Sequence, residues 1–229
     1  MIRVSSVVRT YQSGETQVRA LRGVNLEIAE GEFVAIAGPS GSGKTTLLNL
    51  IGCIDAPDGG TVQIDETDVG TLGRTELALF RRRNLGFIFQ TFNLIPVLSA
   101  RENVAFALSL LDLPETEVNE RTSRILTEVG LESMADRRPT RLSGGQQQRV
   151  AIARALVKEP RIVLADEPTA NLDSETGQQV LELMADMNRR YGTTFVFSTH
   201  DPMVMEMARR LVRLHDGQIS EDSTAGVSA

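Results

Sequence analysis

The chain has 229 residues, of which 41% are hydrophobic and 24% charged, and its formal net charge is -6. This length can form one large domain with a subdomain, and the acidic balance argues against a general nucleic-acid-binding protein. The single cysteine, Cys53, rules out an intramolecular disulfide and fits a reducing compartment. Because Cys53 ends the apolar stretch LLNLIGC, we expect a buried small side chain rather than a reactive thiol.

No apolar run reaches the roughly 18 residues that a membrane-spanning helix needs. The first residues, MIRVSSVVRTYQSGE, lack the apolar segment of a signal peptide. We therefore expect a soluble, cytoplasmic chain whose membrane role, if it has one, depends on a partner.

The N-terminal part predicts strands over residues 2–8 and 24–28, where β-branched residues partly alternate with others. Tyr11 lies between these segments, in the turn-rich sequence TYQSGET. Its ring can stack on a nucleotide base or be an ordinary surface ring, and the residues alone leave both possibilities open.

Residues 33–48, FVAIAGPSGSGKTTLL, organise the rest of the chain. The apolar run at its start predicts a buried strand, a glycine-rich turn follows, and a helix-forming segment comes next. The turn fits the phosphate-binding P-loop pattern G-x-x-x-x-G-K-[ST], whose defining positions are Gly38, Gly43, Lys44 and Thr45.

The residue types of this turn suit phosphate chemistry. Glycines let backbone N–H groups curl around phosphate oxygens. The helix start over residues 44–46 aims further N–H groups and a positive dipole end at the same anion. We expect Lys44 to reach the β- and γ-phosphates of a nucleotide, and the Thr45 hydroxyl to bind Mg²⁺.

Residues 61–65 and 85–89 are predicted as strands and residues 75–83 as a helix. The loop 91–100, TFNLIPVLSA, is apolar without a clear period. It indicates either a contact surface or a loop folded onto its own core.

The pattern becomes helical from residue 101 to residue 130, and Pro114 separates two predicted helices. We therefore expect a helical subdomain over about 95–158, inserted in an α/β core formed by about 1–94 and 159–220. The small polar residues of 221–229 predict a flexible tail.

The sequence LSGGQ occupies residues 142–146, directly before the helical stretch QQRVAIARALV. Gly144 and Gly145 offer a second group of exposed N–H groups that can face phosphate. This signal is weak alone, since its usual meaning is a helix that starts at an N-cap serine, here Ser143.

Asp166 and Glu167 directly follow the continuous apolar run IVLA, which is typical of a central parallel strand. Ligands bind at the carboxyl ends of such strands. In a P-loop protein the first carboxylate holds Mg²⁺, and the second can accept a proton from attacking water. His200 follows another predicted strand, 195–198, and can hydrogen-bond a γ-phosphate or that water.

Taken in order, these motifs resemble the ATP-binding cassette of ABC transporters over nearly the whole chain. The resemblance implies an α/β P-loop NTPase (ABC ATPase) core with an N-terminal antiparallel β subdomain and an inserted α-helical subdomain. It also implies ATP hydrolysis, with ATP and Mg²⁺ bound.

Site residues follow from this resemblance position by position. Gln90 is similar to the Q-loop glutamine and residues 171–173 to the D-loop. The implied catalytic residues are Lys44, Gln90, Glu167 and His200, and the implied Mg²⁺ ligands are Thr45, Gln90 and Asp166. The implied nucleotide-binding residues match the A-loop aromatic, the Walker A loop and the family signature: Tyr11, Gly38, Pro39, Ser40, Gly41, Ser42, Gly43, Lys44, Thr45, Thr46, Ser143, Gly144, Gly145 and Gln146.

Five segments look like the branch that holds lipoprotein-releasing (LolD-type) and macrolide-exporter (MacB-type) ATPases. They are GETQVRALRGVNLEI, GPSGSGKTTLLNLIG, GFIFQTFNLIPVLSARENV, LSGGQQQRVAIARAL and LADEPTANLDSETG. Two departures, Ala170 for the usual Gly and Thr45 for the usual Ser, remove no functional group. The branch implies an FtsX-like membrane subunit. MacB-type proteins fuse that subunit to the cassette, and because this chain ends at Ala229 we expect a separate polypeptide.

The resemblance thus implies a peripheral subunit on the cytoplasmic face of the inner membrane that powers export or extraction of lipoprotein, peptide or drug. Two copies are expected to pair head to tail, with each ATP between the P-loop of one and the signature of the other, and no nucleic acid is expected as a partner. A regulatory cassette that gates a membrane protein, for cell-wall enzyme activation or antibiotic sensing, is the alternative. DNA-repair and translation ATPases carry long coiled-coil insertions or a second cassette, and this chain has neither.

Overall fold

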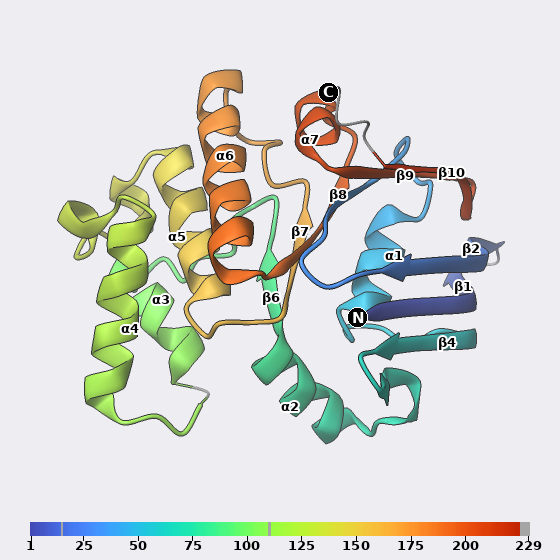
Figure 1. Ribbon diagram of the computed structural model, residues 1–229, viewed down its shortest axis with the longest axis horizontal. Helices are drawn as coiled ribbons and strands as arrows, with labels where there is room; N and C mark the ends of the chain where they lie inside the picture. Colours follow the sequence, from blue (N-terminus) through green and yellow to red (C-terminus); the bar gives the residue numbers. More distant parts are fainter. Residues whose placement is uncertain (15, 110, 225–229) are drawn as a thin grey trace. The chain divides into compact units, whose positions relative to one another are not determined.

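The computed structural model describes residues 1–14, 16–109 and 111–224 (Figure 1). The chain divides into two compact units. Unit 1 comprises Met1–Arg81 together with the C-terminal part from Thr194, and unit 2 comprises Arg82–Thr193. The helix α2 (Arg74–Asn84) begins in unit 1 and ends in unit 2.

Unit 1 contains an antiparallel sheet in the strand order β2-β1-β4-β5. Its hairpin is longer than the sequence predicts, because β1 and β2 remain paired, through several register shifts, out to the pair Ser13 and Thr16. Strand pairing therefore overrides the turn-forming residues around Tyr11. The strands are β1 (Ile2–Ser13), β2 (Thr16–Ile28), β4 (Gly59–Ile64) and β5 (Thr67–Asp68).

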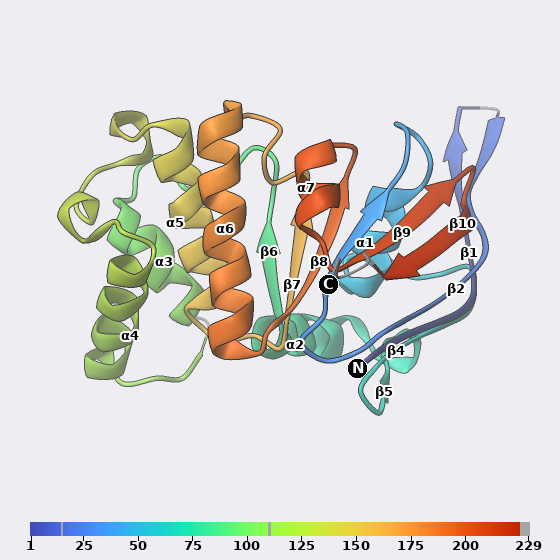
Figure 2. The ribbon, with the colours of Figure 1, turned by 45° about the horizontal axis from the view of Figure 1, so that its top comes forward.

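A second group of strands in unit 1 runs in the order β10-β9-β3-β8 (Figure 2). In this group β3 (Phe33–Ala37) is parallel to both β8 (Thr194–Thr199) and β9 (Arg210–His215). Every residue of β3 and β8 is buried, as central parallel strands require. Unit 1 also contains the helices α1 (Lys44–Ile51) and α7 (Pro202–Met207).

The C-terminal segment differs from its predicted flexibility. The strand β10 (Gln218–Thr224) pairs with β9 in antiparallel register. Arg210 helps to hold β10 against β9, because its guanidinium binds both Asp222, across the strand pair, and Glu32. The remaining part of the predicted tail, 225–229, lies outside the described residues.

Unit 2 pairs β6 (Leu85–Ile88) with β7 (Ile162–Asp166) in parallel. Within this unit α5 packs against α3, α4 and α6 (Figure 1). Pro114 is the N-cap of α4, so the predicted break between two helices at this proline is confirmed. The helices are α3 (Ala100–Leu108), α4 (Glu115–Glu128), α5 (Gly144–Leu156) and α6 (Ser174–Tyr191).

The observed elements confirm the predicted fold class, with parallel α/β strands, an N-terminal antiparallel sheet and a helical portion.

Cys53 is 3% exposed, which confirms its predicted burial. Burial raises the pKa of its thiol to about 11, against a small opposite effect of Arg81.

We predict that Cys53 of the folded protein resists alkylation by iodoacetamide at pH 8, because the reactive thiolate is scarce and shielded. Counting modified thiols by mass spectrometry should give none for the native protein and one per chain in denaturant. Fast stoichiometric labelling of the native protein would contradict the observed burial.

Candidate functional site

The loop between β3 and α1 is built on glycines whose positions tolerate no side chain. A Cβ atom at Gly38 would lie 2.1 Å from the backbone oxygen of Leu214. Gly43 has a φ of +104°, and a Cβ there would lie 2.6 Å from the backbone oxygen of Ala20. The same close approaches that exclude side chains at both ends of the loop bring its backbone into a tight curl.

The start of α1 is suited to bind an anion. Its N-cap is Gly43, which has no side chain to cap the helix, and no acidic residue occupies its first turn. By contrast, a side chain caps α3, α5 and α6. A helix start without such a cap directs N–H groups and the positive end of the helix dipole at whatever lies before it.

Lys44 holds the loop closed while keeping a positive charge inside it. Its ammonium donates to the backbone oxygens of Gly38, at 2.8 Å, and Pro39, at 3.0 Å, and the residue is only 7% exposed. The buried hydroxyl of Ser42 has no hydrogen-bond partner among the described residues. Donors that converge on one small loop fit the oxygens of a phosphate chain.

Tyr11 is held from two directions in unit 1. Its hydroxyl donates to Asp55 at 2.7 Å, and the guanidinium of Arg9 lies over the ring, 4.8 Å from the centroid. Arg9 is itself fixed by ion pairs to Asp55 and Asp58. No local sequence pattern predicts this clamp, since Asp55 and Asp58 lie in the turn-forming stretch DAPDGG, far along the chain from Tyr11.

His200 lies at the same edge of the sheet as the glycine loop. The parallel strands β3 and β8 pair Ala37 with Thr199, so Gly38 and His200 both follow directly after paired residues. The side chain of Asp201 caps α7 by accepting from Met203 N. The structure therefore brings the predicted loop and the predicted histidine to one edge within unit 1.

Unit 2 brings Gln90 and the two predicted carboxylates to the carboxyl ends of its parallel strands β6 and β7. Parallel pairing joins Ile88 to Ala165, so Gln90 and Asp166 leave neighbouring strands in the same direction. The amide of Asn171 donates to the backbone oxygen of Gln90 at 2.8 Å, which ties the two segments together. Glu167 has a φ of +47°, a conformation uncommon for a residue other than glycine.

The LSGGQ segment is a helix start, as its simplest interpretation predicts. Ser143 and Gln146 form a reciprocal capping box at the beginning of α5. Ser143 is nevertheless exposed. A Cβ atom at Gly145 would lie 2.3 Å from the methyl group of Thr176, so close packing of α5 on α6 requires glycine there.

Among the residues that the structure describes, no group of three or more His, Cys, Asp or Glu side chains could hold an ion. Mg²⁺ bound with nucleotides needs no such group, because it takes most of its ligands from phosphates and water. Of the predicted ligands, Thr45 belongs to unit 1, and Gln90 and Asp166 belong to unit 2.

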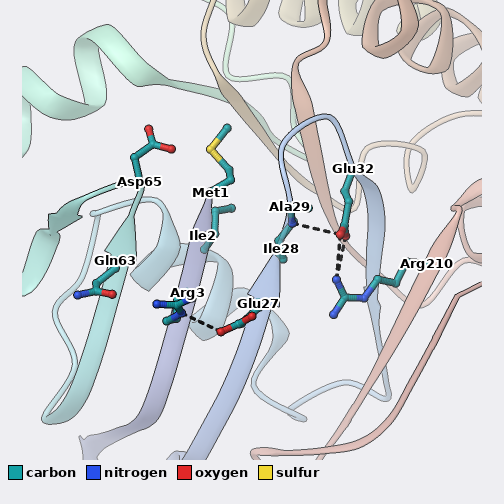
Figure 3. Close-up of a pocket in the computed structure, with 10 residues that line it drawn as sticks. All are labelled: Met1, Ile2, Arg3, Glu27, Ile28, Ala29, Glu32, Gln63, Asp65 and Arg210. Carbon is teal, nitrogen blue, oxygen red and sulfur yellow. Dashed lines mark hydrogen bonds and ion pairs between the residues drawn. The ribbon is translucent and has the colours of Figure 1, made fainter.

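A polar hollow of about 460 Å³ in unit 1 lies apart from these residues along the chain (Figure 3). None of its lining residues belongs to the loop 38–46. Its two arginines are paired with carboxylates, Arg3 with Glu27 and Arg210 with Glu32, and a further carboxylate, that of Asp65, also lines it.

None of the helices in the described part of the chain is both long and apolar enough to cross a membrane.

The chain matches the family "ABC transporter" over residues 21–170. It is 47% identical to the "Uncharacterized ABC transporter ATP-binding protein MJ0796" of Methanocaldococcus jannaschii, a match that covers 97% of this chain and 96% of that protein.

It is also 47% identical to the "Macrolide export ATP-binding/permease protein MacB" of Brucella melitensis over 98% of this chain. The chain spans only 34% of the length of that relative.

Solved structures show the same fold. The structure titled "Dimeric structure of a post-hydrolysis state of the ATP-binding cassette MJ0796 bound to ADP and Pi" superposes with a TM-score of 0.90 at 45% identity, covering 99% of this chain and 100% of that one. The family match and the near-complete overlap with cassette proteins agree with the loop, the capping box and the strand ends described above. The chain belongs to the ABC transporter family and is an ATPase cassette of that family.

Proposed function

We propose that this chain is the ATP-hydrolysing subunit of an export or extraction machine, acting through a separate FtsX-like membrane subunit on the cytoplasmic face of the membrane. The observation that carries the proposal is the start of α1, where Gly43 leaves the helix without a side-chain cap beside the ammonium of Lys44. MacB relatives named for macrolide export support the export role. They are about three times as long as this chain, so their activity enters here as a proposal only.

The P-loop of unit 1 binds the phosphates in this account. Backbone N–H groups of residues 38–46 surround the phosphate oxygens, and Lys44 exchanges its two carbonyl partners for the β- and γ-phosphates. Tyr11 stacks on the adenine base, with its ring orientation fixed by Arg9 and Asp55. A ring that is already oriented loses little freedom when the base binds.

Thr45, Asp166 and Gln90 would hold Mg²⁺, which would supply positive charge to the phosphates of the nucleotide. Glu167 accepts a proton from the attacking water at its carboxylate oxygen. His200 donates a hydrogen bond to the γ-phosphate. The left-handed backbone at Glu167 fits a carboxylate that must leave the strand end in a fixed direction.

The signature at the start of α5 acts on the ATP of a second copy. The exposed Ser143 hydroxyl and the N–H groups of Gly144 and Gly145 complete a site across a two-fold axis. The dimeric state named for the MJ0796 cassette supports this pairing. ATP then stabilises the closed pair, and hydrolysis removes the contacts that closed it.

A groove of about 340 Å³ in unit 2 is the proposed docking site for the membrane subunit. It is lined by aromatic and aliphatic side chains and by two basic residues, Arg154 and Lys158, with no acidic residue among its lining. Burial lowers the pKa of Lys158 to about 8. The groove therefore suits an apolar segment that carries a carboxylate.

The predicted contact loop 91–100 borders this groove. The guanidinium of Arg154 donates to the backbone oxygens of Phe92 and Asn93. The buried amide of Asn103 makes further hydrogen bonds to the loop backbone, at Ile95, Leu98 and Ser99. Val97 is 68% exposed on this well-anchored loop. An exposed apolar side chain on a rigid loop fits a contact surface better than a loop folded onto its own core.

We predict that Glu167→Gln keeps ATP binding but lowers turnover by roughly 10²–10⁴, the usual contribution of a positioned general base. Phosphate release by the purified variant measures the loss. Lys44→Ala is the contrast, because it removes a charge partner of the phosphates and should weaken nucleotide binding itself. Near wild-type turnover by Glu167→Gln would remove Glu167 from the proposed role.

The second prediction concerns the signature. In the Glu167→Gln background ATP should trap a dimer, because hydrolysis cannot reopen it. Adding Ser143→Arg places a bulky side chain against the γ-phosphate of the other copy and should leave a monomer that still binds nucleotide. Size-exclusion chromatography with ATP decides between them. A double variant that dimerises, or a monomer that loses its nucleotide, would indicate a signature that works within its own chain.

The third prediction concerns docking. Leu94→Asp and Val97→Asp should abolish co-purification with the FtsX-like subunit from gently solubilised membranes and leave basal ATP hydrolysis unchanged. Leu79→Asp is the matched control, because Leu79 is an exposed apolar residue on α2, outside the loop 91–100. Survival of the complex, or unfolding of the isolated variants, would identify the loop as core rather than interface.

A further inference from the structure

Gln148 of α5 is a buried amide whose position packing alone does not explain. The residue is 0% exposed, and its Nε2 donates to the backbone oxygen of Pro168 at 2.5 Å. Its Oε1 has no partner within the described part of the chain. Burying a half-satisfied amide is costly, and an apolar side chain of the same shape would avoid that cost. The single hydrogen bond that Gln148 does make therefore calls for a specific role.

The carbonyl that Gln148 binds belongs to Pro168, the residue directly after Glu167. Glu167 has the left-handed φ of +47°, and its own backbone oxygen accepts from Ala170 N at 3.3 Å in the following turn. Pro168 has no N–H group, so its carbonyl is its one backbone hydrogen-bonding group. Fixing this carbonyl fixes the direction in which the Glu167 side chain leaves the strand.

The other end of this connection is the signature. Gly144 and Gln148 are four positions apart in α5 and so lie on the same face of the helix. At the helix start, a Cβ atom added at Gly144 would lie 3.4 Å from the side chain of Leu172, and one at Gly145 would lie 2.3 Å from that of Thr176. The beginning of α5 thus contacts the same segment, 167–176, at several points, and Gln148 supplies a directional contact next to the carboxylate.

We propose that Gln148 is a positioning residue for ATP hydrolysis: it ties the signature helix to the Pro168 carbonyl and thereby sets the orientation of Glu167. The inference rests on the proposed role of Glu167 as the proton acceptor. Gln148 touches neither nucleotide nor metal in this account. Its loss should therefore slow the hydrolytic step and leave nucleotide binding by the P-loop intact.

Gln148→Met tests this, because methionine keeps the length of the side chain and removes the donor. We expect kcat for ATP hydrolysis to fall roughly 10- to 100-fold, as expected when a catalytic group is displaced by about 1 Å, with KM for ATP within about twofold of wild type. Slow hydrolysis with intact binding should also let the variant accumulate an ATP-bound dimer on size-exclusion chromatography. A merely structural role would reduce that dimer.

Gln147→Met is the matched control. Gln147 is the preceding residue of α5 and also donates its amide to a carbonyl, that of Leu142 at 3.1 Å, away from Glu167. This variant should keep wild-type kcat. Gln148→Asn, one methylene shorter, gives a second polar variant that places the amide wrongly, and it should show the same loss of kcat as Gln148→Met.

Wild-type kcat in a folded Gln148→Met or Gln148→Asn protein would overturn the inference while leaving the proposed function intact. Failure of both variants to fold would also overturn it, since Gln148 would then be a structural core residue. If the wild-type chain itself did not hydrolyse ATP, or Glu167→Gln did not slow it, the proposed function would fail first. The two failures are therefore distinguishable.

Discussion

The organisation of unit 1 depends on how α1 begins: its N-cap is a glycine, which provides no side-chain cap for the first turn. The first N–H groups of a helix have no partners within the helix itself, so an anion placed before them is a favourable partner. The surrounding geometry follows from this requirement, because Gly38 and Gly43 press the loop against backbone oxygens and Lys44 holds it closed.

Parallel pairing then determines which residues meet. In unit 1 the pairing of β3 with β8 brings the loop and His200 to one edge. In unit 2 the pairing of β6 with β7 does the same for Gln90 and the two carboxylates. Residues far apart in the sequence therefore become neighbours through strand register alone. In the proposed mechanism a second copy supplies the signature.

Local sequence patterns were sufficient to predict the loop, the carboxylates, the LSGGQ helix start and the order of most elements, because each depends on neighbouring residues. They were not sufficient for contacts between distant segments. The clamp of Arg9 and Asp55 on Tyr11 and the bond from Gln148 to Pro168 join residues about 20 to 50 positions apart. Strand pairing also determines the length of the β1–β2 hairpin, and pairing together with an ion pair makes residues 221–224 a strand. No local sequence pattern shows these interactions.

The central claim is that each ATP is completed by the P-loop of one copy and the signature of the other. Mixing Lys44→Ala chains with Ser143→Arg chains tests it most directly, because each variant alone lacks an intact site while a mixed dimer contains one. The account predicts that ATP hydrolysis by the mixture rises well above the sum of the two separate activities. Hydrolysis that stays at that sum, with mixed dimers verified by two affinity tags, would contradict it.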